Sequence, residues 1–170
     1  MGTRELDFAE FYRGSKDECL ATVAVCVGGV DTAQDLVAEA FARAWASWRT
    51  VSRHPAPKAW VIRTALNVNV SRWRRRHRET PVADPGLVTD QPLPGTPAGS
   101  TVDPRIMAAL MRLPARQRQV VALRLFLDLD TSQTAGVLGI ASGTVQAHLG
   151  RAIAALRRDL QTETLQERPS

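Results

Sequence analysis

The sequence lacks any apolar run near the twenty residues that a membrane-spanning helix needs, and its beginning has no apolar core typical of a secretory signal. We therefore expect no membrane insertion and a cytoplasmic location. The sequence also lacks an alternating polar and apolar pattern of any length, and it has no internal repeat. These absences favour an all-α protein. A chain of 170 residues can form one domain or two small ones, each with a core.

Cysteine and histidine, which often bind metals or act in catalysis, are scarce: the sequence has two cysteines and three histidines. Cys19 and Cys26 lie seven residues apart on one predicted helix, about 10 Å along its axis, which is too far for a disulfide. No histidine is near them in sequence, so we expect free, buried thiols and no metal site. No His, Cys or carboxylate cluster has the arrangement of a catalytic site. We expect neither an enzyme nor a bound cofactor.

Lysine is nearly absent, because only Lys16 and Lys58 accompany the arginines among 22 basic residues. The net charge of +5 is unevenly distributed along the chain. Residues 58–78 and 104–160 are strongly basic, whereas the intervening residues 79–103 are acidic. Two basic blocks with an acidic spacer predict two contacts with a polyanion.

The second basic block contains the pattern of a helix-turn-helix. Asp130 and Gln133 are spaced as a capping box, and they predict the start of the first helix. Gly139 should end that helix, and Ser142 should cap the next. An apolar stripe of the second helix should face a core: Val145, Leu149, Ala152, Ile153, Leu156 and Leu160. The opposite face has side chains suited to a major groove, namely Thr144, Gln146, Ala147, His148 and Arg151. The alternative is a pair of helices in an ordinary bundle.

The first basic block ends in an arginine run. Five arginines occupy the seven positions from residue 72 to 78, and no carboxylate lies between residues 58 and 78. Trp73 lies within the run, and Asn67 and Asn69 precede it by one to two helical turns. Cationic, aromatic and amide groups together suit bases that have left the duplex stack. A solvated helix end is the alternative interpretation.

Helical periodicity covers most of the remaining chain. We expect helices at residues 5–30, as one helix or a broken pair, and at residues 31–48, 58–78, 104–113 and 114–127. Asp31 should cap the second of these, and Asp103 with Pro104 should begin the fourth. The segment before Pro104 has five prolines, three glycines and no aromatic residue, which predicts an extended, mobile linker. The prediction is two small helical domains, at residues 1–79 and 104–162, joined by a flexible proline-rich linker at 80–103 and followed by a tail at 163–170.

Four segments occur in a specific order, at residues 31–45, 59–67, 113–124 and 138–152. The first reads DTAQDLVAEAFARAW, and the proline-rich spacer lies between the second and third. In this order the segments resemble regions 2 and 4 of bacterial RNA polymerase sigma factors of the sigma-70 family, of the small extracytoplasmic-function (ECF) type. The resemblance implies a region 2 helical bundle and a region 4 helix-turn-helix. It also implies a factor that directs core polymerase to promoters and helps to open the DNA.

The resemblance further implies partners and site residues. The partners are core RNA polymerase, through the clamp of its largest subunit and the flap of its second subunit, and promoter DNA. An anti-sigma factor is a candidate partner, because such factors often hold family members inactive. The residues implied at the clamp are Asp35, Leu36, Glu39 and Phe41. Those implied at the minus-ten element are Val51, Arg53, Trp60, Arg63, Asn67, Arg72, Trp73, Arg74, Arg75 and Arg76.

The loop at residues 49–57 is expected to shape a pocket beside Asn67 for one base extruded from the minus-ten element. The residues implied at the minus-thirty-five element are Thr144, Gln146, Ala147, His148 and Arg151. Many family members are more basic in this helix, and Gly150 replaces a larger residue. A stand-alone helix-turn-helix regulator, which would dimerise on a palindrome without polymerase, is the alternative function.

Overall fold

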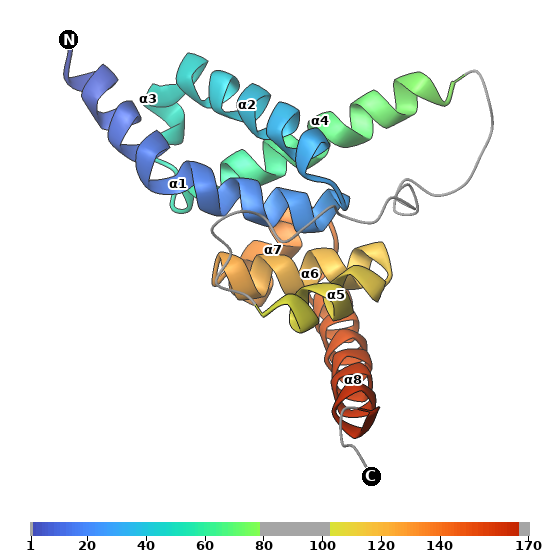
Figure 1. The fold of residues 1–170 in the computed structure, drawn as a ribbon. Helices are drawn as coiled ribbons and strands as arrows, with labels where there is room; N and C mark the ends of the chain where they lie inside the picture. The colour runs from blue at the N-terminus through green and yellow to red at the C-terminus, as the bar shows by residue number, and fades with distance from the viewer. Residues whose placement is uncertain (1, 79–102, 167–170) are drawn as a thin grey trace.

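The fold is taken from a computed structural model that describes residues 2–78 and 103–166 (Figure 1). Within these residues the chain forms eight α-helices and no β-strand, so the all-α prediction holds for the described part. The linker predicted at residues 80–103 lies outside the described residues except for Asp103. The predicted tail lies partly outside them, beyond residue 166.

The N-terminal unit consists of α1 (Thr3–Val27), α2 (Val30–Ala46), α3 (Trp48–Val51) and α4 (Pro57–Arg76). Helices α2 and α4 pack against α1 and against each other (Figure 1). Pro57 occupies the first position of α4, where its missing N–H leaves no hydrogen bond unmade. An ion pair between Lys58 and Glu18 joins the start of α4 to α1.

The junction between α1 and α2 differs from the expectation. Gly28 ends α1 in the left-handed conformation, with φ at 78°, and its N–H donates to the carbonyl of Ala24. Gly29 then takes the N-cap position of α2, and Val30 is already helical. The prediction that Asp31 caps this helix is therefore wrong. Asp31 lies in the first turn, where its negative charge still complements the positive end of the helix dipole.

Aromatic rings join the N-terminal half of α1 to the C-terminal part of α2 and to α3. Phe11 lies 5.1 Å from Trp48 and 5.9 Å from Phe41 between ring centroids, and Tyr12 meets Phe41 edge to face at 4.9 Å. Offset and edge-to-face ring pairs contribute about 0.5–1.5 kcal/mol each beyond the area that they bury. This contact fixes the C-terminal end of α2, which precedes the loop leading to α4.

The C-terminal unit consists of α5 (Pro104–Arg112), α6 (Ala115–Phe126), α7 (Thr131–Leu138) and α8 (Ser142–Gln166). As predicted, Asp103 caps α5 by accepting a hydrogen bond from the N–H of Arg105 at 2.8 Å. Helix α8 packs on α5, α6 and α7 through residues that include Val145, Ala152 and Leu156, and its C-terminal end extends away from them (Figure 1).

The two units pack against each other and share one hydrophobic core. Residues 22–27 of α1 are all buried, and six consecutive buried positions cover every side of a helix. Helices α2 and α4 cover one side of α1, and α6 of the C-terminal unit covers another. Helix α7 also contacts α4. Residues of the C-terminal unit that belong to the shared core include Met107, Leu123, Leu129 and Val137.

Arg118 is the buried charged residue at this interface. Its guanidinium donates to the carbonyls of Leu113, at 3.3 Å, and Met111, at 3.4 Å. It lies close enough to Cys26 of α1 for the two groups to interact electrostatically. Burial raises the pKa of the Cys26 thiol to about 12, and the Arg118 charge opposes this only in part. The thiol is therefore neutral at physiological pH.

Candidate nucleic-acid interface

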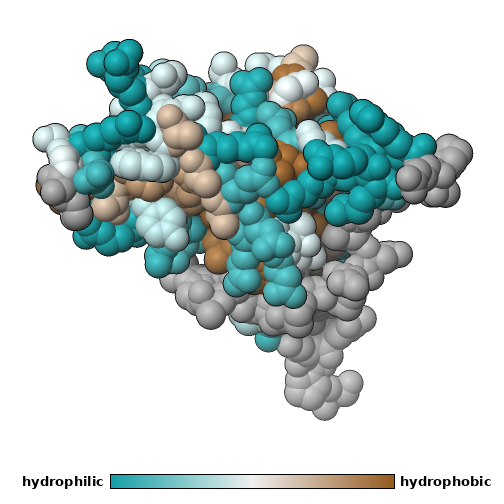
Figure 2. Space-filling view, turned by 90° about the horizontal axis from the view of Figure 1, so that it is seen from above, coloured by the Kyte–Doolittle hydropathy of each residue, from teal (hydrophilic) through white to brown (hydrophobic). Residues whose placement is uncertain are grey.

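The C-terminal end of α4 presents a concentration of positive charge. Arg74, Arg75 and Arg76 are exposed in the last helical turn, where the helix dipole favours cations. Figure 2 shows hydrophilic residues gathered at this end of the molecule, on the right of both views. Exposed arginines in a stretch that has no carboxylate from residue 58 to residue 78 are suited to contact phosphates.

Trp73 lies within this run but is half-buried. Its ring stacks on His77 with 4.5 Å between centroids and 17° between planes, and His77 Nδ1 lies 2.9 Å from the Trp73 carbonyl oxygen. The indole Nε1 is buried and has no hydrogen-bond partner within the described residues. One face of the indole is thus covered by His77, which restricts the stacking on unpaired bases that the sequence suggested.

A pocket of about 390 Å³ opens between the C-terminal end of α2 and the first half of α4. Trp60, Thr64 and Asn67 line it from α4, where positions i, i+4 and i+7 share one face. Arg43, Ala46 and Ser47 line it from the end of α2. The pocket therefore offers an indole ring, an amide, two hydroxyls and a guanidinium.

The pocket agrees with the sequence analysis only in part. Trp60 and Asn67 meet at it, as expected for residues of one site. The loop at residues 49–57, which was expected to shape the pocket, contributes no residue to its lining. Val51 of this loop is only 1% exposed, because its side chain faces the core. Arg53 and Arg63 are exposed away from the lining. The sequence analysis missed Arg43, Ala46, Ser47 and Thr64, although the spacing of Trp60, Thr64 and Asn67 could have indicated Thr64.

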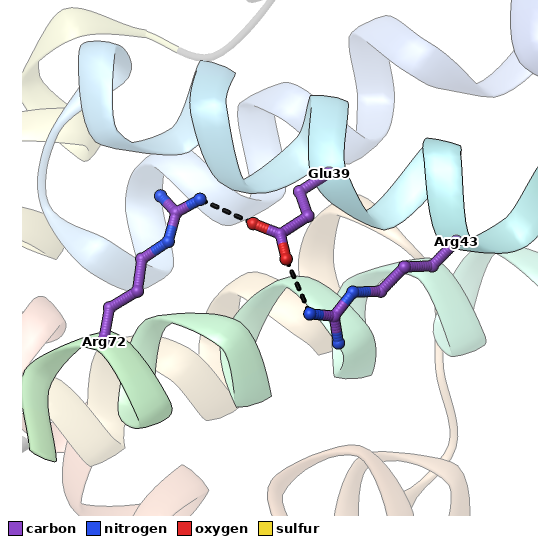
Figure 3. Close-up of polar contacts among 3 residues, drawn as sticks. All are labelled: Glu39, Arg43 and Arg72. Carbon is purple, nitrogen blue, oxygen red and sulfur yellow. Dashed lines mark hydrogen bonds and ion pairs between the residues drawn. The ribbon is translucent and has the colours of Figure 1, made fainter. Parts of the chain in front are cut away.

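One carboxylate joins two arginines beside this pocket (Figure 3). Glu39 Oε1 accepts a hydrogen bond from Arg43 at 2.6 Å, and Glu39 Oε2 accepts one from Arg72 of α4 at 2.5 Å. The hydrogen bond from Arg43 is the main cause that holds the pKa of Glu39 below its usual value, and Arg72 adds to the effect. Both carboxylate oxygens are therefore occupied within the N-terminal unit.

The four residues implied at the polymerase clamp occupy different environments on α2. Asp35 is exposed, as a docking surface requires. Leu36 is fully buried and Phe41 is 3% exposed, because both face α1 and the core. In this structure neither side chain is accessible to a docked protein. Both pack beneath the exposed face of α2, and Glu39 faces α4.

The helix-turn-helix forms as its sequence predicts. Asp130 accepts a hydrogen bond from the N–H of Gln133 at 2.7 Å, and the Gln133 side chain accepts one from the N–H of Asp130 at 2.9 Å. Gly139 ends α7 with φ at 65°, in the left-handed region. Ser142 is itself the first residue of α8 rather than a residue before it. After this turn, residues 142–144, 146 and 147 of α8 are exposed, whereas Val145 is buried.

The two faces of α8 divide largely as expected. Val145 and Ala152 are fully buried, whereas Ile153 is 38% exposed and does not belong to the apolar stripe. Ile153 lies at the edge of the stripe, about 80° around the helix axis from Val145 at 3.6 residues per turn. His148 is half-buried, and its Nδ1 has no hydrogen-bond partner within the described residues. Exposed residues on the predicted reading face are Thr144, Gln146, Ala147 and Arg151.

Metal-binding groups, free thiols and membrane-spanning helices are further features to consider among the described residues. No group of three or more His, Cys, Asp or Glu side chains there could hold a metal ion. Cys19 and Cys26 are free and buried, as predicted. In the same part of the chain, no helix combines the length and the apolar character needed to span a membrane.

Comparison with known proteins identifies the family. Residues 20–79 match Sigma-70 region 2, and residues 104–156 match Sigma-70, region 4. The chain is 32% identical to the RNA polymerase sigma-E factor of Streptomyces coelicolor over 168 residues, which cover 96% of this chain and 91% of the relative. It is 34% identical to the ECF RNA polymerase sigma factor SigL of Mycobacterium tuberculosis over 143 residues, covering 79% of this chain and 77% of SigL.

A solved structure has the same fold. The sigma factor RpoE of Bartonella quintana, crystallised with the anti-sigma factor NepR, superposes with a TM-score of 0.70. The match covers 91% of this chain and 97% of that one, at 23% sequence identity. The order of the segments, the helix-turn-helix and these likenesses lead to one conclusion. The chain belongs to the sigma-70 family of RNA polymerase sigma factors, in its ECF subfamily, and it directs core RNA polymerase to promoters.

Proposed function

We propose that the N-terminal unit binds the polymerase clamp and the minus-ten element, and that the C-terminal unit binds the minus-thirty-five element. The pocket between α2 and α4, beside the arginine run, is the observation that carries the proposal. The protein would act in the cytoplasm, with the polymerase, and would supply binding energy rather than catalysis.

The pocket suits a single extruded base. A flipped base is read by hydrogen bonds to its edge and by stacking on an aromatic ring. Trp60 offers a ring, while Asn67 and Arg43 offer hydrogen-bonding groups. The exposed arginines at the end of α4 would hold the phosphates of the adjoining strand. Phosphate contacts would position the strand, and the pocket would read the base.

Polymerase docking is assigned to an exposed stripe on α2. Asp31, Asp35, Ala38, Ala42 and Trp45 are exposed and follow one another at helical spacing. The two alanines at its centre would allow a helix of the clamp to approach closely. The two carboxylates at one end would attract a basic partner. The fully buried Leu36 and the buried Phe41 would hold α2 in place beneath this stripe.

The minus-thirty-five element is assigned to the exposed face of α8. Thr144, Gln146 and Arg151 project from its first turns, so their donors and acceptors are available to base edges. Arg151 is the strongest candidate for a direct base contact, because a guanidinium can bind two acceptors of one guanine.

Promoter binding would require the two units to separate. Two promoter elements about two dozen base pairs apart are about 80 Å from each other at about 3.4 Å per base pair. The α1–α6 and α4–α7 contacts hold the units together on one core. We propose that core polymerase stabilises a separated arrangement, and that the packed arrangement is the resting state. An anti-sigma factor that binds the packed units would favour that state.

The pocket assignment is tested by Asn67→Ala in a reconstituted holoenzyme. Run-off transcription on a promoter library randomised at the minus-ten element should show a changed base preference at one position. Ser71→Ala, an exposed substitution on the same helix outside the pocket, is the control. An unchanged preference in Asn67→Ala, with normal core binding, would remove the pocket from the minus-ten site.

A further inference from the structure

We propose that the buried charge of Arg118 weakens the packing of the two units on each other, so that core polymerase can separate them. This inference rests on the proposed separation of the units at the promoter. It goes further by naming one residue that sets how readily they separate. Arg118 lies outside the pocket, the arginine run and the exposed face of α8, so its role would differ from those of the DNA-contacting residues.

The surroundings of Arg118 carry the first step. The residue is 5% exposed, and no other charged residue in the described part of the chain is buried. It lies close enough to Cys26 for an electrostatic interaction, where α6 packs on α1 (Figure 1). Within residues 2–78 and 103–166, no carboxylate forms an ion pair with it. A buried charge without a counter-charge is costly, because the protein replaces its hydration only in part.

The hydrogen bonds of Arg118 carry the second step, because they stay inside the C-terminal unit. Its Nη1 donates to the carbonyls of Leu113, at 3.3 Å, and Met111, at 3.4 Å, both at the end of α5. These distances exceed the usual range of about 2.7–3.2 Å. Its Nε is buried and has no partner within the described residues. Both hydrogen bonds can persist when α1 moves away, so they do not join the two units.

Packing on α1 therefore removes water from the guanidinium without giving it a new hydrogen bond. Burial lowers the pKa of Arg118 from its usual value, so the charged form is less stable here than in water. Separation of α1 from α6 would return water to the unpartnered Nε. The apolar side chains of the shared core, such as Met107 and Leu123, favour the packed arrangement. The charge of Arg118 favours the separated one.

This opposition has a consequence for the binding of core polymerase. A partner that binds only separated units has its affinity reduced by the fraction of chains that are separated. Weaker packing makes this fraction larger, so less of the binding energy of polymerase is used to open the chain. Replacing buried charges with apolar side chains of similar volume is often stabilising. Arg118→Met should therefore hold the units together more tightly and reduce the apparent affinity for polymerase.

The test measures the alkylation rate of Cys26 in the free full-length chain, where polymerase has no influence. Arg118→Met and Arg118→Gln are compared with their Cys19→Ala parent, in which Cys26 is the remaining thiol. Arg116→Met makes the same chemical change at an exposed arginine of α6 and is the matched control. Arg118→Gln removes the charge but keeps an amide that can donate to carbonyls, so it remains informative if Arg118→Met does not fold.

Two further measurements accompany the alkylation rate. Thermal melting shows whether each variant is folded. The concentration of core polymerase that gives half-maximal run-off transcription shows the effect on activation. In separated chains Cys26 and Arg118 lie on different units, so the loss of the Arg118 charge should not change the reactivity of the exposed thiol itself.

We expect Cys26 to react about ten-fold more slowly in both Arg118 variants than in the parent, and both variants to need about ten-fold more core polymerase. Arg116→Met should match the parent in both measurements. Faster or equal alkylation in folded Arg118 variants would overturn the inference but leave the packed resting state intact. Loss of folding in both Arg118 variants would assign Arg118 to the stability of the C-terminal unit and would also overturn it. If Cys26 of the parent reacts no faster in the promoter complex than in the free chain, the proposed separation fails as well.

Discussion

Arg151 and Arg74 are both exposed arginines, but their surroundings assign them different roles. Arg151 lies on the reading face of α8, next to residues that suit base edges. Arg74 lies at the end of α4 among other arginines. We expect Arg151→Ala to weaken minus-thirty-five binding by about 1–3 kcal/mol and to relax preference at one base position. We expect Arg74→Ala to weaken binding to all sequences alike and to reduce the slope of the salt dependence by about one.

Fluorescence anisotropy with promoter fragments at several salt concentrations, using the holoenzyme, measures both effects. Arg158→Ala, an exposed change farther along α8, is the control for Arg151. Equal losses on every sequence for Arg151→Ala would contradict a base-reading role.

The two buried cysteines predict how stability depends on pH. Burial raises the pKa of Cys19 and of Cys26 to about 12, from a value near 9 in an unfolded chain. A group whose pKa is raised by folding contributes stability that is fully present below the unfolded pKa. That stability is lost as the pH rises through the folded value. The free energy of unfolding should therefore fall between about pH 9 and pH 12, by up to about 1.4 kcal/mol per pH unit for each thiol.

Urea unfolding at several pH values checks this prediction. A Cys19→Ala, Cys26→Ala variant removes both thiols, so its stability should fall less steeply over the same range, even if its absolute stability is lower. Equal slopes for the variant and wild type would show that the thiols do not contribute.

Helix α2 has two faces with different surroundings. Its exposed stripe includes Asp35, and the side facing α4 includes Glu39. Asp35→Arg should weaken binding to core polymerase by about ten-fold, or about 1.4 kcal/mol, because like charges would meet on the basic surface expected of the clamp. Folding should be unaffected, since Asp35 is exposed and lies outside the core.

Titration of labelled protein with core polymerase measures this effect. Asp17→Arg reverses an exposed charge on α1, away from the stripe, and should bind as wild type does. Normal affinity in the folded Asp35→Arg variant would contradict the docking assignment.

Features set by a few neighbouring residues were predictable from the sequence. The capping box of Asp130 and Gln133 and the left-handed Gly139 depend only on local backbone geometry, and the structure confirms them. The prediction that Asp31 is the N-cap of α2 is wrong, although its spacing to Gln34 is that of a capping box. Gly28 and Gly29 end the preceding helix and take the cap position first.

Features that depend on packing between helices were not predictable. Leu36 belongs to a motif that the family resemblance associates with polymerase, but only the placement of α1 shows that it is buried. The pocket needs the end of α2 beside the first half of α4, so Arg43 and Ser47 had no sequence signal that linked them to Asn67. The second contact of Glu39, with Arg72, likewise crosses 33 positions of sequence.

The shared core between the two units makes a prediction about the whole molecule. Cys26 is 2% exposed at the contact between α1 and α6, close to Arg118, whereas Cys19 lies on α1 near Lys58 of α4. If polymerase separates the units, Cys26 should lose its cover and Cys19 should keep it. Only an exposed thiol can form the reactive thiolate readily. Alkylation of Cys26 should therefore be slow in the free protein and at least about ten-fold faster in the promoter complex.

Single-cysteine variants separate the two thiols. Cys19→Ala reports on Cys26, and Cys26→Ala reports on Cys19, which should stay unreactive in both states. Mass spectrometry of the alkylated peptide gives the rates. Equal rates for Cys26 in the free protein and in the complex would show that the units remain packed on each other during initiation.

If this chain gives core polymerase its promoter choice through two separate DNA contacts, the two together should open a promoter that neither opens alone. The most direct test is permanganate footprinting of a promoter selected from the library, with core polymerase alone, the chain alone and both together. We predict unpaired thymines at the minus-ten element and a single transcription start site only when both are present. Asp35→Arg should weaken both signals when the protein concentration is limiting. DNA binding by a dimer of the chain without polymerase, and no opening when polymerase is added, would contradict the account.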